Sequence, residues 1–219
     1  MLNQIYIDNI INTALFEDIN YIDVTTDNLI DDSHQSSAYF IAKDSGVLCG
    51  IDIAARVFEL AGGNVETEIL LKDGTQVKKG DVIANLKGST KTLLKGERTA
   101  LNLLQHMSGI ATAANKCVRL AEGTNAKITD TRKTLPGLRA LQKYAVTVGG
   151  GRNHRFNLSD GAMLKDNHIG AAGGGKKDVE MAKAYAPFVR KIEVEVENMN
   201  MVKEAVAAGA DIIMLDNMT

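Results

Sequence analysis

The chain has 219 residues, of which 45% are hydrophobic and 24% charged, and its formal net charge is -2. This composition predicts a globular protein of one large or two small domains. No apolar run approaches the roughly 20 residues that span a bilayer, and there is no tryptophan for stacking nucleic-acid bases, so we expect a cytoplasmic protein that binds neither membranes nor nucleic acid.

The first half of the sequence predicts a helix, a small mixed domain and a long second helix. Apolar residues recur at helical spacing over residues 2–18. Between residues 36 and 91, four short β-type runs surround one helix over 52–61, which indicates an α+β domain. Its segment 73–81 predicts a hairpin with Gly74 and Gly80 at positive φ. A helix over 95–122 is expected to bridge two domains.

After Gly123 the pattern changes to an alternation of strands and helices. We predict strands over 126–131, 161–165, 189–197 and 211–216, separated by helices over 135–148, 176–186 and 199–208. Pro136 falls in the first turn of the first of these helices, and Gly209 follows the last. This alternation predicts parallel strands with right-handed crossovers. The glycine-rich segment 170–175 lacks the spacing of a phosphate-binding loop, and we interpret it as a lid or connector.

Basic residues are concentrated in one segment of this acidic chain. Between Lys127 and His168, eight Lys and Arg residues occur with three acids, so the segment carries +5 and the remainder -7. A local positive field of this kind indicates a pocket for a small, multiply charged anion, because a nucleic-acid binder normally spreads its basic residues over a whole face.

Charged residues also fall at the carboxyl ends of the four predicted parallel strands. Arg132 and Lys133 follow the first strand, Lys165 ends the second, Glu195 lies near the end of the third and Asp216 ends the fourth. In parallel β/α architectures the loops at these ends open onto one face. Any one of these residues could be a solvated loop charge, but the agreement of four strand ends favours a single charged site.

Acidic and apolar residues alternate along 192–198. Period two puts Glu193, Glu195 and Glu197 on one face of a strand and Ile192, Val194 and Val196 on the other. Inward-facing carboxylates need a cation, either Lys or Arg or an oxygen-binding ion such as Mg²⁺ that arrives with substrate phosphates. An exposed edge strand with a polar face is the alternative.

Two further pairs of residues bear on the chemistry. His154 and Arg155 are adjacent in a loop, and the planar fork of arginine suits carboxylate or phosphate. Cys49 and Cys117 lie far apart in the sequence, so we expect two buried, reduced thiols rather than a disulfide or a metal site.

Six ordered motifs resemble those of the quinolinate phosphoribosyltransferase family, and the resemblance covers the whole chain. They lie at residues 97–104, 129–134, 150–155, 163–168, 193–197 and 214–217. The resemblance implies an α/β fold: an N-terminal α+β sandwich domain over residues 1–108, then an open parallel α/β barrel of fewer than eight strands over 109–219. It also implies a homodimer with shared active sites, in which each sandwich domain caps the partner's barrel; a higher oligomer stays open.

The resemblance assigns roles to individual residues. The substrate-binding group is Arg98, which is expected from the other subunit, with Thr131, Arg132, Lys133, His154, Arg155 and Lys165. The catalytic group is Lys133, Lys165, Glu195 and Asp216, and the two acids also face Mg²⁺. The implied reaction joins quinolinate to phosphoribosyl pyrophosphate and gives nicotinate mononucleotide, pyrophosphate and CO₂, a step of NAD synthesis.

Other interpretations stay open beside this one. The chain stops three residues after Asp216, whereas the family continues through further strands, so we expect a barrel truncated at its C-terminus. An inactive fragment that only dimerises is therefore one alternative. A nicotinate phosphoribosyltransferase is another, although it handles one carboxylate and needs fewer cationic groups. Residues 77–84 also resemble the hairpin of a biotinyl or lipoyl carrier, which would leave most of the chain without a role.

Overall fold

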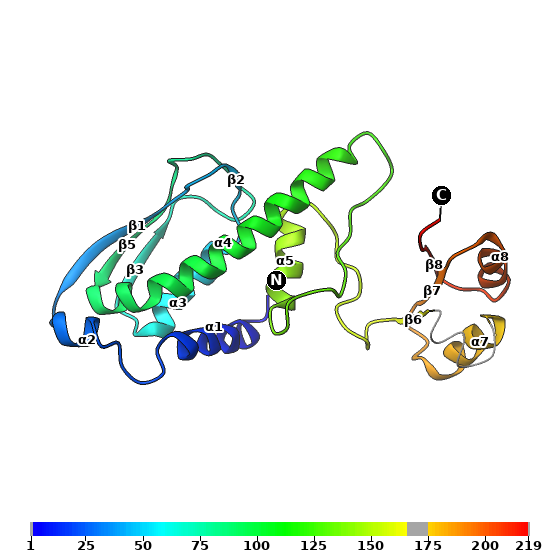
Figure 1. Ribbon diagram of the computed structural model, residues 1–219, viewed down its shortest axis with the longest axis horizontal. Coiled ribbons are helices and arrows are strands. Elements are labelled where there is room, and N and C mark those ends of the chain that lie inside the picture. The colour runs from blue at the N-terminus through cyan, green and yellow to red at the C-terminus, as the bar shows by residue number, and fades with distance from the viewer. Residues whose placement is uncertain (1, 166–174, 219) are drawn as a thin grey trace. The chain divides into compact units, whose positions relative to one another are not determined.

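The computed structural model describes residues 2–165 and 175–218. The chain forms two compact units, Met1–His154 and Arg155–Thr219, each with its own hydrophobic core (Figure 1). The mixed α/β class expected from the sequence is confirmed. Of the predicted connector at 170–175, all but the last residue lies outside the described part of the chain. The division into domains at 108/109 stays a prediction.

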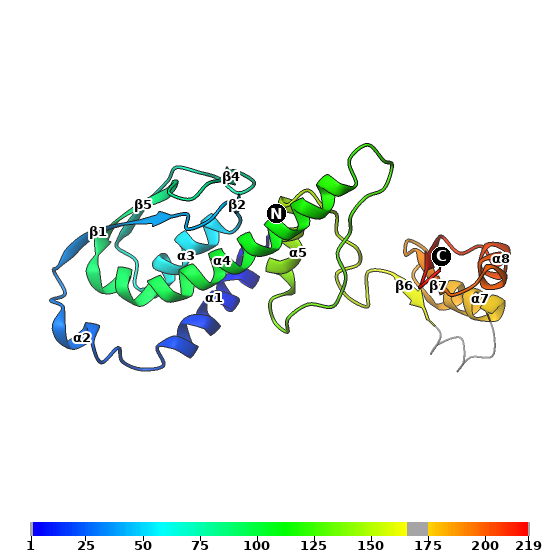
Figure 2. The same cartoon turned by 45° about the horizontal axis from the view of Figure 1, so that its top comes forward.

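The first unit is built on a three-stranded antiparallel sheet. Strands β1 (Gln35–Ile41), β5 (Val82–Ser89) and β3 (Val65–Ile69) lie in the order β1-β5-β3. Along β5 the buried Ala84 and Leu86 alternate with the exposed Asn85 and Lys87, as expected of a sheet with one covered face. Helices α3 (Ile51–Ala61) and α4 (Thr90–Leu120) contact this sheet and each other (Figure 2). The predicted α+β domain is therefore confirmed.

The prediction of a hairpin over 73–81 is wrong, because the strand in this segment pairs with a different part of the chain. Strand β4 (Gln76–Val77) pairs with β2 (Gly46–Val47) rather than within its own segment. Gly74 and Gly80 do take positive φ, at 89° and 98°. At the start of this segment the Asp73 carboxylate accepts hydrogen bonds from the backbone N–H groups of Gly50 and Ile51, and so caps the start of α3.

Two N-terminal helices are attached to this unit by ion pairs. Helix α1 (Gln4–Asp18) begins at Asn3, whose side chain accepts from the N–H groups of Ile5 and Tyr6, and it is followed by the short α2 (Thr26–Leu29). Asp8 pairs with Arg56 of α3 at 2.8 Å, and Asp27 pairs with Lys95 of α4 at 2.5 Å. The predicted helix over 2–18 is confirmed.

Helix α4 carries the main core of the first unit. Its 31 residues begin at the cap Ser89, and Leu103, Met107 and Ala111 lie on its buried face. Met107 and Ala111 are fully buried, and so is Leu141 of helix α5 (Arg139–Val148), which packs against α4. The core thus ties α5, which precedes the predicted His154 loop, to the N-terminal domain. In the described part of the chain, no helix combines the length and apolar character needed to span a bilayer.

The predictions for 126–148 need two corrections. Residues 126–131 form no strand, and only Thr129 makes an isolated parallel bridge, to Arg152. Helix α5 begins at Arg139 and not at 135, because Gly137 takes φ 78°, which lies outside the helical range, and Pro136 therefore precedes the helix. Gly149 follows α5 so close to α4 that a Cβ would lie 2.4 Å from the Ala111 carbonyl oxygen.

The second unit is a parallel sheet with two helices. Strands β6 (Ala162–Leu164), β7 (Ile192–Val196) and β8 (Ile212–Leu215) lie in the order β6-β7-β8, all parallel. Helices α7 (Gly175–Tyr185) and α8 (Met199–Ala207) form the crossovers, and Gly209 has φ 74° just after α8. Val179 and Ala205 of these helices share a core with Val194 and its neighbours on one face of the sheet. Three of the four predicted strands are confirmed.

Candidate active site

The second unit brings two predicted catalytic residues into direct contact. The Lys165 ammonium donates to Glu195 Oε2 at 2.6 Å. Lys165 directly follows β6 and Glu195 lies in β7, and the pairing of Leu164 with Val194 puts the two residues side by side. The Glu195 side chain is 14% exposed and that of Lys165 41%. A mostly buried carboxylate is thus neutralised by a lysine that still reaches solvent.

Asp216 lies on the adjacent strand end. Its N–H donates to the Val196 carbonyl at 2.9 Å, which continues the ladder of β7 and β8 by one residue. Glu195 pairs with Met214, and since side chains alternate along a strand, Asp216 shares the face of Met214 and Glu195. Asp216 is exposed. The predicted gathering of Lys165, Glu195 and Asp216 at one sheet edge therefore agrees with the strand register.

The predicted strand with alternating faces is confirmed at β7, where Ile192, Val194 and Val196 pack in one apolar core. Strand β7 is the central strand, so the exposed-edge alternative is wrong. Val194 and Val196 pack against the helices, while Glu193 on the opposite face is only 5% exposed. Glu197, past the end of the strand, is exposed. The sheet therefore has one apolar face and one face with buried carboxylates.

Arg155 begins the second unit and contacts Gly161, which directly precedes β6, and Met163 within β6. Its Nη1 donates to the Gly161 carbonyl at 3.2 Å, and its Nη2 contacts Met163 Sδ at 3.2 Å. Arg155 Nε is buried and has no partner in the part of the chain that the structure describes. A guanidinium with a spare buried donor suits an anionic ligand.

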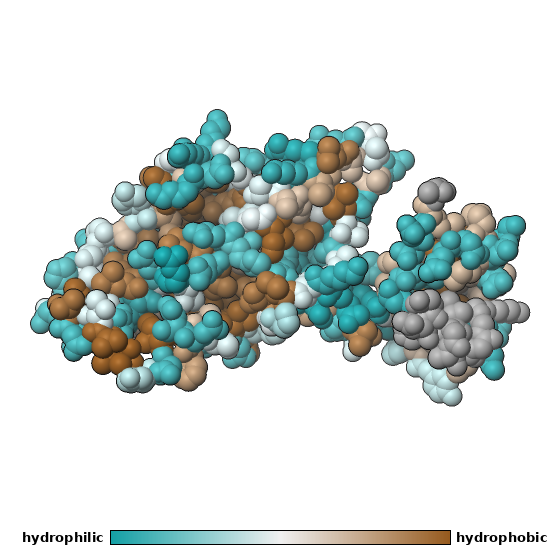
Figure 3. Space-filling model, in the orientation of Figure 1, coloured by the Kyte–Doolittle hydropathy of each residue, from teal (hydrophilic) through white to brown (hydrophobic). Residues whose placement is uncertain are grey.

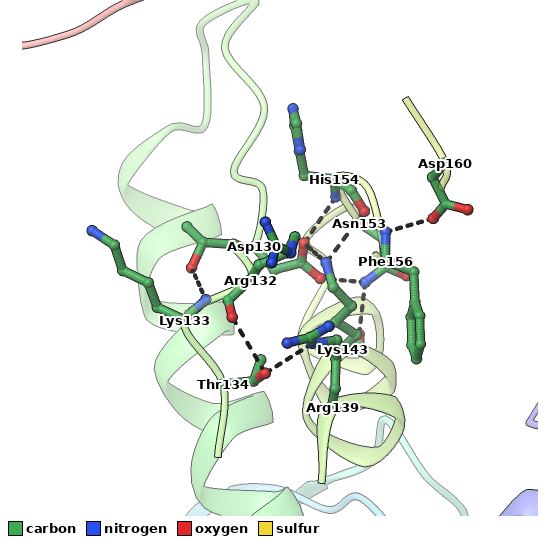
Figure 4. Close-up of polar contacts among 11 residues, drawn as sticks. Asp130, Arg132, Lys133, Thr134, Arg139, Lys143, Asn153, His154, Phe156 and Asp160 are labelled. Atoms are coloured by element: carbon green, nitrogen blue, oxygen red, sulfur yellow. Dashed lines mark hydrogen bonds and ion pairs between the residues drawn. The ribbon is translucent and has the colours of Figure 1, made fainter. Parts of the chain in front are cut away.

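The first unit presents the other predicted binding residues on a short turn. The Thr131 hydroxyl accepts from the Lys133 N–H at 3.0 Å, and the Thr134 N–H donates to the Arg132 carbonyl at 2.9 Å. Arg132 Nε is also buried without a partner among the described residues. Figure 4 shows the Lys133 side chain extending away from Asp130. The turn thus offers consecutive cations on a backbone fixed by its own hydrogen bonds.

His154 is attached to the same turn through its backbone. Its N–H donates to Asp130 Oδ1 at 2.8 Å, one residue before Thr131. Arg152 completes the link, since its N–H donates to the Ile128 carbonyl and its carbonyl accepts from the Asp130 N–H. Arg98, the remaining predicted residue, is exposed on α4. The sequence interpretation missed Asp130 as a structural centre of this region.

The carboxylates of the second unit suit a hard cation. Glu195 and Asp216 offer only oxygen donors, which Mg²⁺ prefers, and Mg²⁺ commonly takes its other ligands from water and substrate phosphates. Among the described residues, no three His, Cys, Asp or Glu side chains gather as a metal centre.

Both cysteines are free; Cys49 is buried as predicted, and Cys117 is exposed, against the prediction.

A parallel β/α sheet with cations and carboxylates at its carboxyl edge, in a chain that also contains a helix-and-sheet domain, defines a class of α/β enzymes that act on anionic substrates. The model of the quinolinate phosphoribosyl transferase N-terminal domain matches residues 23–108, and that of the C-terminal domain matches residues 110–219. The chain therefore belongs to the quinolinate phosphoribosyltransferase family.

Individual relatives agree with this assignment. The chain is 44% identical, over 99% of its length and 74% of the relative, to a probable nicotinate-nucleotide pyrophosphorylase [carboxylating] of Bacillus subtilis. It is similar to the crystal structure of NadC from Streptococcus pyogenes, with a TM-score of 0.95, 47% identity and coverage of 100% of this chain and 78% of the other. The nicotinate-nucleotide pyrophosphorylase of Francisella tularensis gives a TM-score of 0.95 at 40% identity, with 100% and 77% covered.

Proposed function

We propose that this protein transfers a phosphoribosyl group from phosphoribosyl pyrophosphate to quinolinate and releases pyrophosphate and CO₂, giving nicotinate mononucleotide for NAD synthesis. The name of the relatives, pyrophosphorylase [carboxylating], describes the same reaction written in reverse. The observation that carries the proposal is the Lys165–Glu195 pair at the carboxyl edge of the sheet, in a chain of this family.

The chemistry places a cationic centre beside these carboxylates. The ring nitrogen of quinolinate forms a bond to the ribose C1, while the bond from C1 to the pyrophosphate oxygen breaks and pyrophosphate leaves with the electron pair. Positive charge develops at C1, and Glu195 and Asp216 stabilise it. Glu195 and Asp216 would also hold Mg²⁺, which when bound would supply positive charge that neutralises pyrophosphate. Lys133 and Lys165 add cationic groups for the same anion.

Loss of CO₂ follows from the pyridinium that this transfer creates. The bond between ring C2 and its carboxylate breaks, and the electron pair stays at C2, next to the positively charged nitrogen. A proton from solvent then binds to C2. The second carboxylate, on C3, remains, and Arg132, His154 and Arg155 are the proposed anchors for the two carboxylates.

We also propose a homodimer in which Arg98 reaches the partner's site. Arg98 is exposed on α4. Large apolar side chains are exposed in the N-terminal segment, among them Phe16 at 68%, Tyr21 at 90% and Leu29 at 75%, and Figure 3 shows hydrophobic surface over α2. Such patches are typical of protein interfaces.

The two free cysteines agree with a reducing compartment, and we place the protein in the cytoplasm.

The substrate is tested by direct competition. With phosphoribosyl pyrophosphate and Mg²⁺ present, the full natural protein should convert quinolinate to nicotinate mononucleotide and should leave nicotinate unchanged. Chromatography of the nucleotide product measures both reactions. Equal turnover of nicotinate would favour the one-carboxylate alternative and contradict the proposal, because a pocket with cations for two carboxylates leaves one set unpaired when nicotinate binds.

A further inference from the structure

A buried ion pair lies behind the predicted binding loops of the first unit. The Lys143 ammonium contacts the Asp130 carboxylate, and the two side chains are only 3% and 6% exposed. Asn153 Nδ2 donates to the second Asp130 oxygen and also to the Lys143 carbonyl. Figure 4 shows the pair surrounded by these partners. Every oxygen of the Asp130 carboxylate is therefore engaged by the protein itself.

The pair holds both backbone polar groups of His154. Asp130 Oδ1 accepts from the His154 N–H at 2.8 Å, and Lys143 Nζ donates to the His154 carbonyl at 3.2 Å. Both peptide groups that flank the His154 Cα are thus fixed by charged side chains. This fixes the direction in which the imidazole leaves the backbone, and Figure 4 shows the ring extending away from Asp130.

The same pair also fixes the turn that carries the cations. Asp130 immediately precedes Thr131, Arg132 and Lys133, so its position sets where this turn begins. Lys143 lies on α5, whose Leu141 and Ala145 are fully buried in the core. Because a buried charge that loses its partner is strongly destabilising, neither side chain can leave the other. Two loops and one helix are therefore linked at a single point.

We propose that Asp130 and Lys143 form a positioning pair, which presets His154 and the Thr131–Lys133 turn to receive the carboxylates of quinolinate. The pair does not touch the substrate, since both side chains are buried. Lys143 adds no free positive charge to the site, and it cancels the negative charge of Asp130, which would otherwise repel a dianionic substrate. This inference rests on the proposed function.

The test compares Lys143→Met with a matched variant in the next residue of α5, Tyr144→Phe. Tyr144 Oη donates to Asp73 at 3.0 Å, so its variant also removes a polar contact of α5 without a link to His154. Lys143→Met should raise the quinolinate dissociation constant about tenfold or more and leave that of phosphoribosyl pyrophosphate within about twofold. Tyr144→Phe should lower the melting temperature and leave quinolinate binding unchanged. Titration calorimetry measures the dissociation constants, and thermal unfolding measures the melting temperatures.

A double variant, Asp130→Asn with Lys143→Met, covers the case in which the single variant fails to fold. Removing both charges should restore folding relative to either single change, yet quinolinate should still bind about tenfold more weakly or worse, because the His154 carbonyl loses its donor. Wild-type affinity in either charge variant, or an equal loss in Tyr144→Phe, would overturn the positioning role. A wild-type protein that binds no quinolinate would instead overturn the proposed function.

Discussion

The ammonium of Lys165 and the carboxylate of Glu195 lie 2.6 Å apart across two neighbouring parallel strands. The pair is arranged so that Glu195 is the more buried partner and Lys165 remains open to solvent. The pyrophosphate group of bound phosphoribosyl pyrophosphate can therefore attract the lysine, and Glu195 is then available to the cationic ribose centre. The ion pair therefore provides a positive group for the departing pyrophosphate and a negative group for the cationic ribose centre.

Replacing Glu195 tests this arrangement. Glu195→Gln should lower kcat by roughly 10²-fold or more and leave quinolinate affinity nearly unchanged, because an interaction made mainly in the transition state affects kcat. Asp216→Asn should behave in the same way. Glu197→Gln, in an exposed residue just beyond β7, is the control and should keep wild-type kinetics. Full activity of Glu195→Gln in steady-state assays would refute the role of this carboxylate.

Arg155 should act in substrate binding rather than in the chemical step. Arg155→Ala should weaken quinolinate binding about tenfold or more, because a hydrogen bond to a charged group contributes about 1.5–3 kcal/mol. Arg190→Ala is the matched control, since Arg190 Nη1 donates to the Asp160 carbonyl at 3.3 Å, next to the Gly161 carbonyl that Arg155 contacts. Calorimetric titration with quinolinate should separate the two variants; equal affinities would remove Arg155 from the site.

Subunit mixing tests whether Arg98 serves the partner's site. Arg98→Ala and Lys133→Ala homodimers should each be inactive. A heterodimer of the two variants should recover part of the wild-type activity, because one of its two composite sites then has every group intact. Heterodimers can be isolated with two different affinity tags and assayed directly. A pure heterodimer with no recovered activity would show that Arg98 works within its own subunit or only packs.

Acid should loosen the N-terminal helices. Lys95 holds the pKa of Asp27 below its ordinary value, and Arg56 does the same for the pKa of Asp8. A carboxyl group whose pKa is lowered by folding stabilises the fold above its unfolded pKa of about 4, and this contribution is lost as the pH falls through the folded pKa. The melting temperature of Lys95→Met should therefore fall less between about pH 5 and pH 3 than that of the wild type. This is about the pH range in which Asp27 titrates.

The control for this pH experiment is Lys79→Met, in an exposed residue of the turn before β5. It should follow the wild type at both pH values. If the melting temperatures of Lys95→Met and the wild type fall by the same amount on acidification, the ion pair with Asp27 does not contribute to the pH dependence of stability.

The sequence predicts the second unit well because its patterns are regular. Strand β7 alternates apolar and acidic residues, and the structure buries Val194 at 3% exposure and Val196 at 0% against the helices. Gly209 marks the end of α8 as expected. The apolar period and the glycine are local properties, and local properties are what a single sequence records.

The sequence predicts the region 126–154 less well, because the structure of this region depends on long-range polar contacts. Residues 126–131 have a strand-like composition, but Thr129 alone bridges to Arg152. Lys143 belongs to the cationic segment in the sequence, yet it is buried against Asp130. Residues two apart lie about 200° around a helix, so Lys143 is on the side of α5 opposite the core residues Leu141 and Ala145, where the helical pattern predicts an exposed charge. Its burial depends on Asp130, which lies outside the helix.

Isotope labelling of the substrate tests the central claim most directly. The full natural protein is incubated with phosphoribosyl pyrophosphate, Mg²⁺ and quinolinate that carries ¹³C in either the C2 or the C3 carboxylate. The account predicts labelled CO₂ from the C2 form alone, in equal amount to nicotinate mononucleotide, while the C3 label stays in the nucleotide. Nucleotide formed without CO₂, or CO₂ released without phosphoribosyl pyrophosphate, would contradict it.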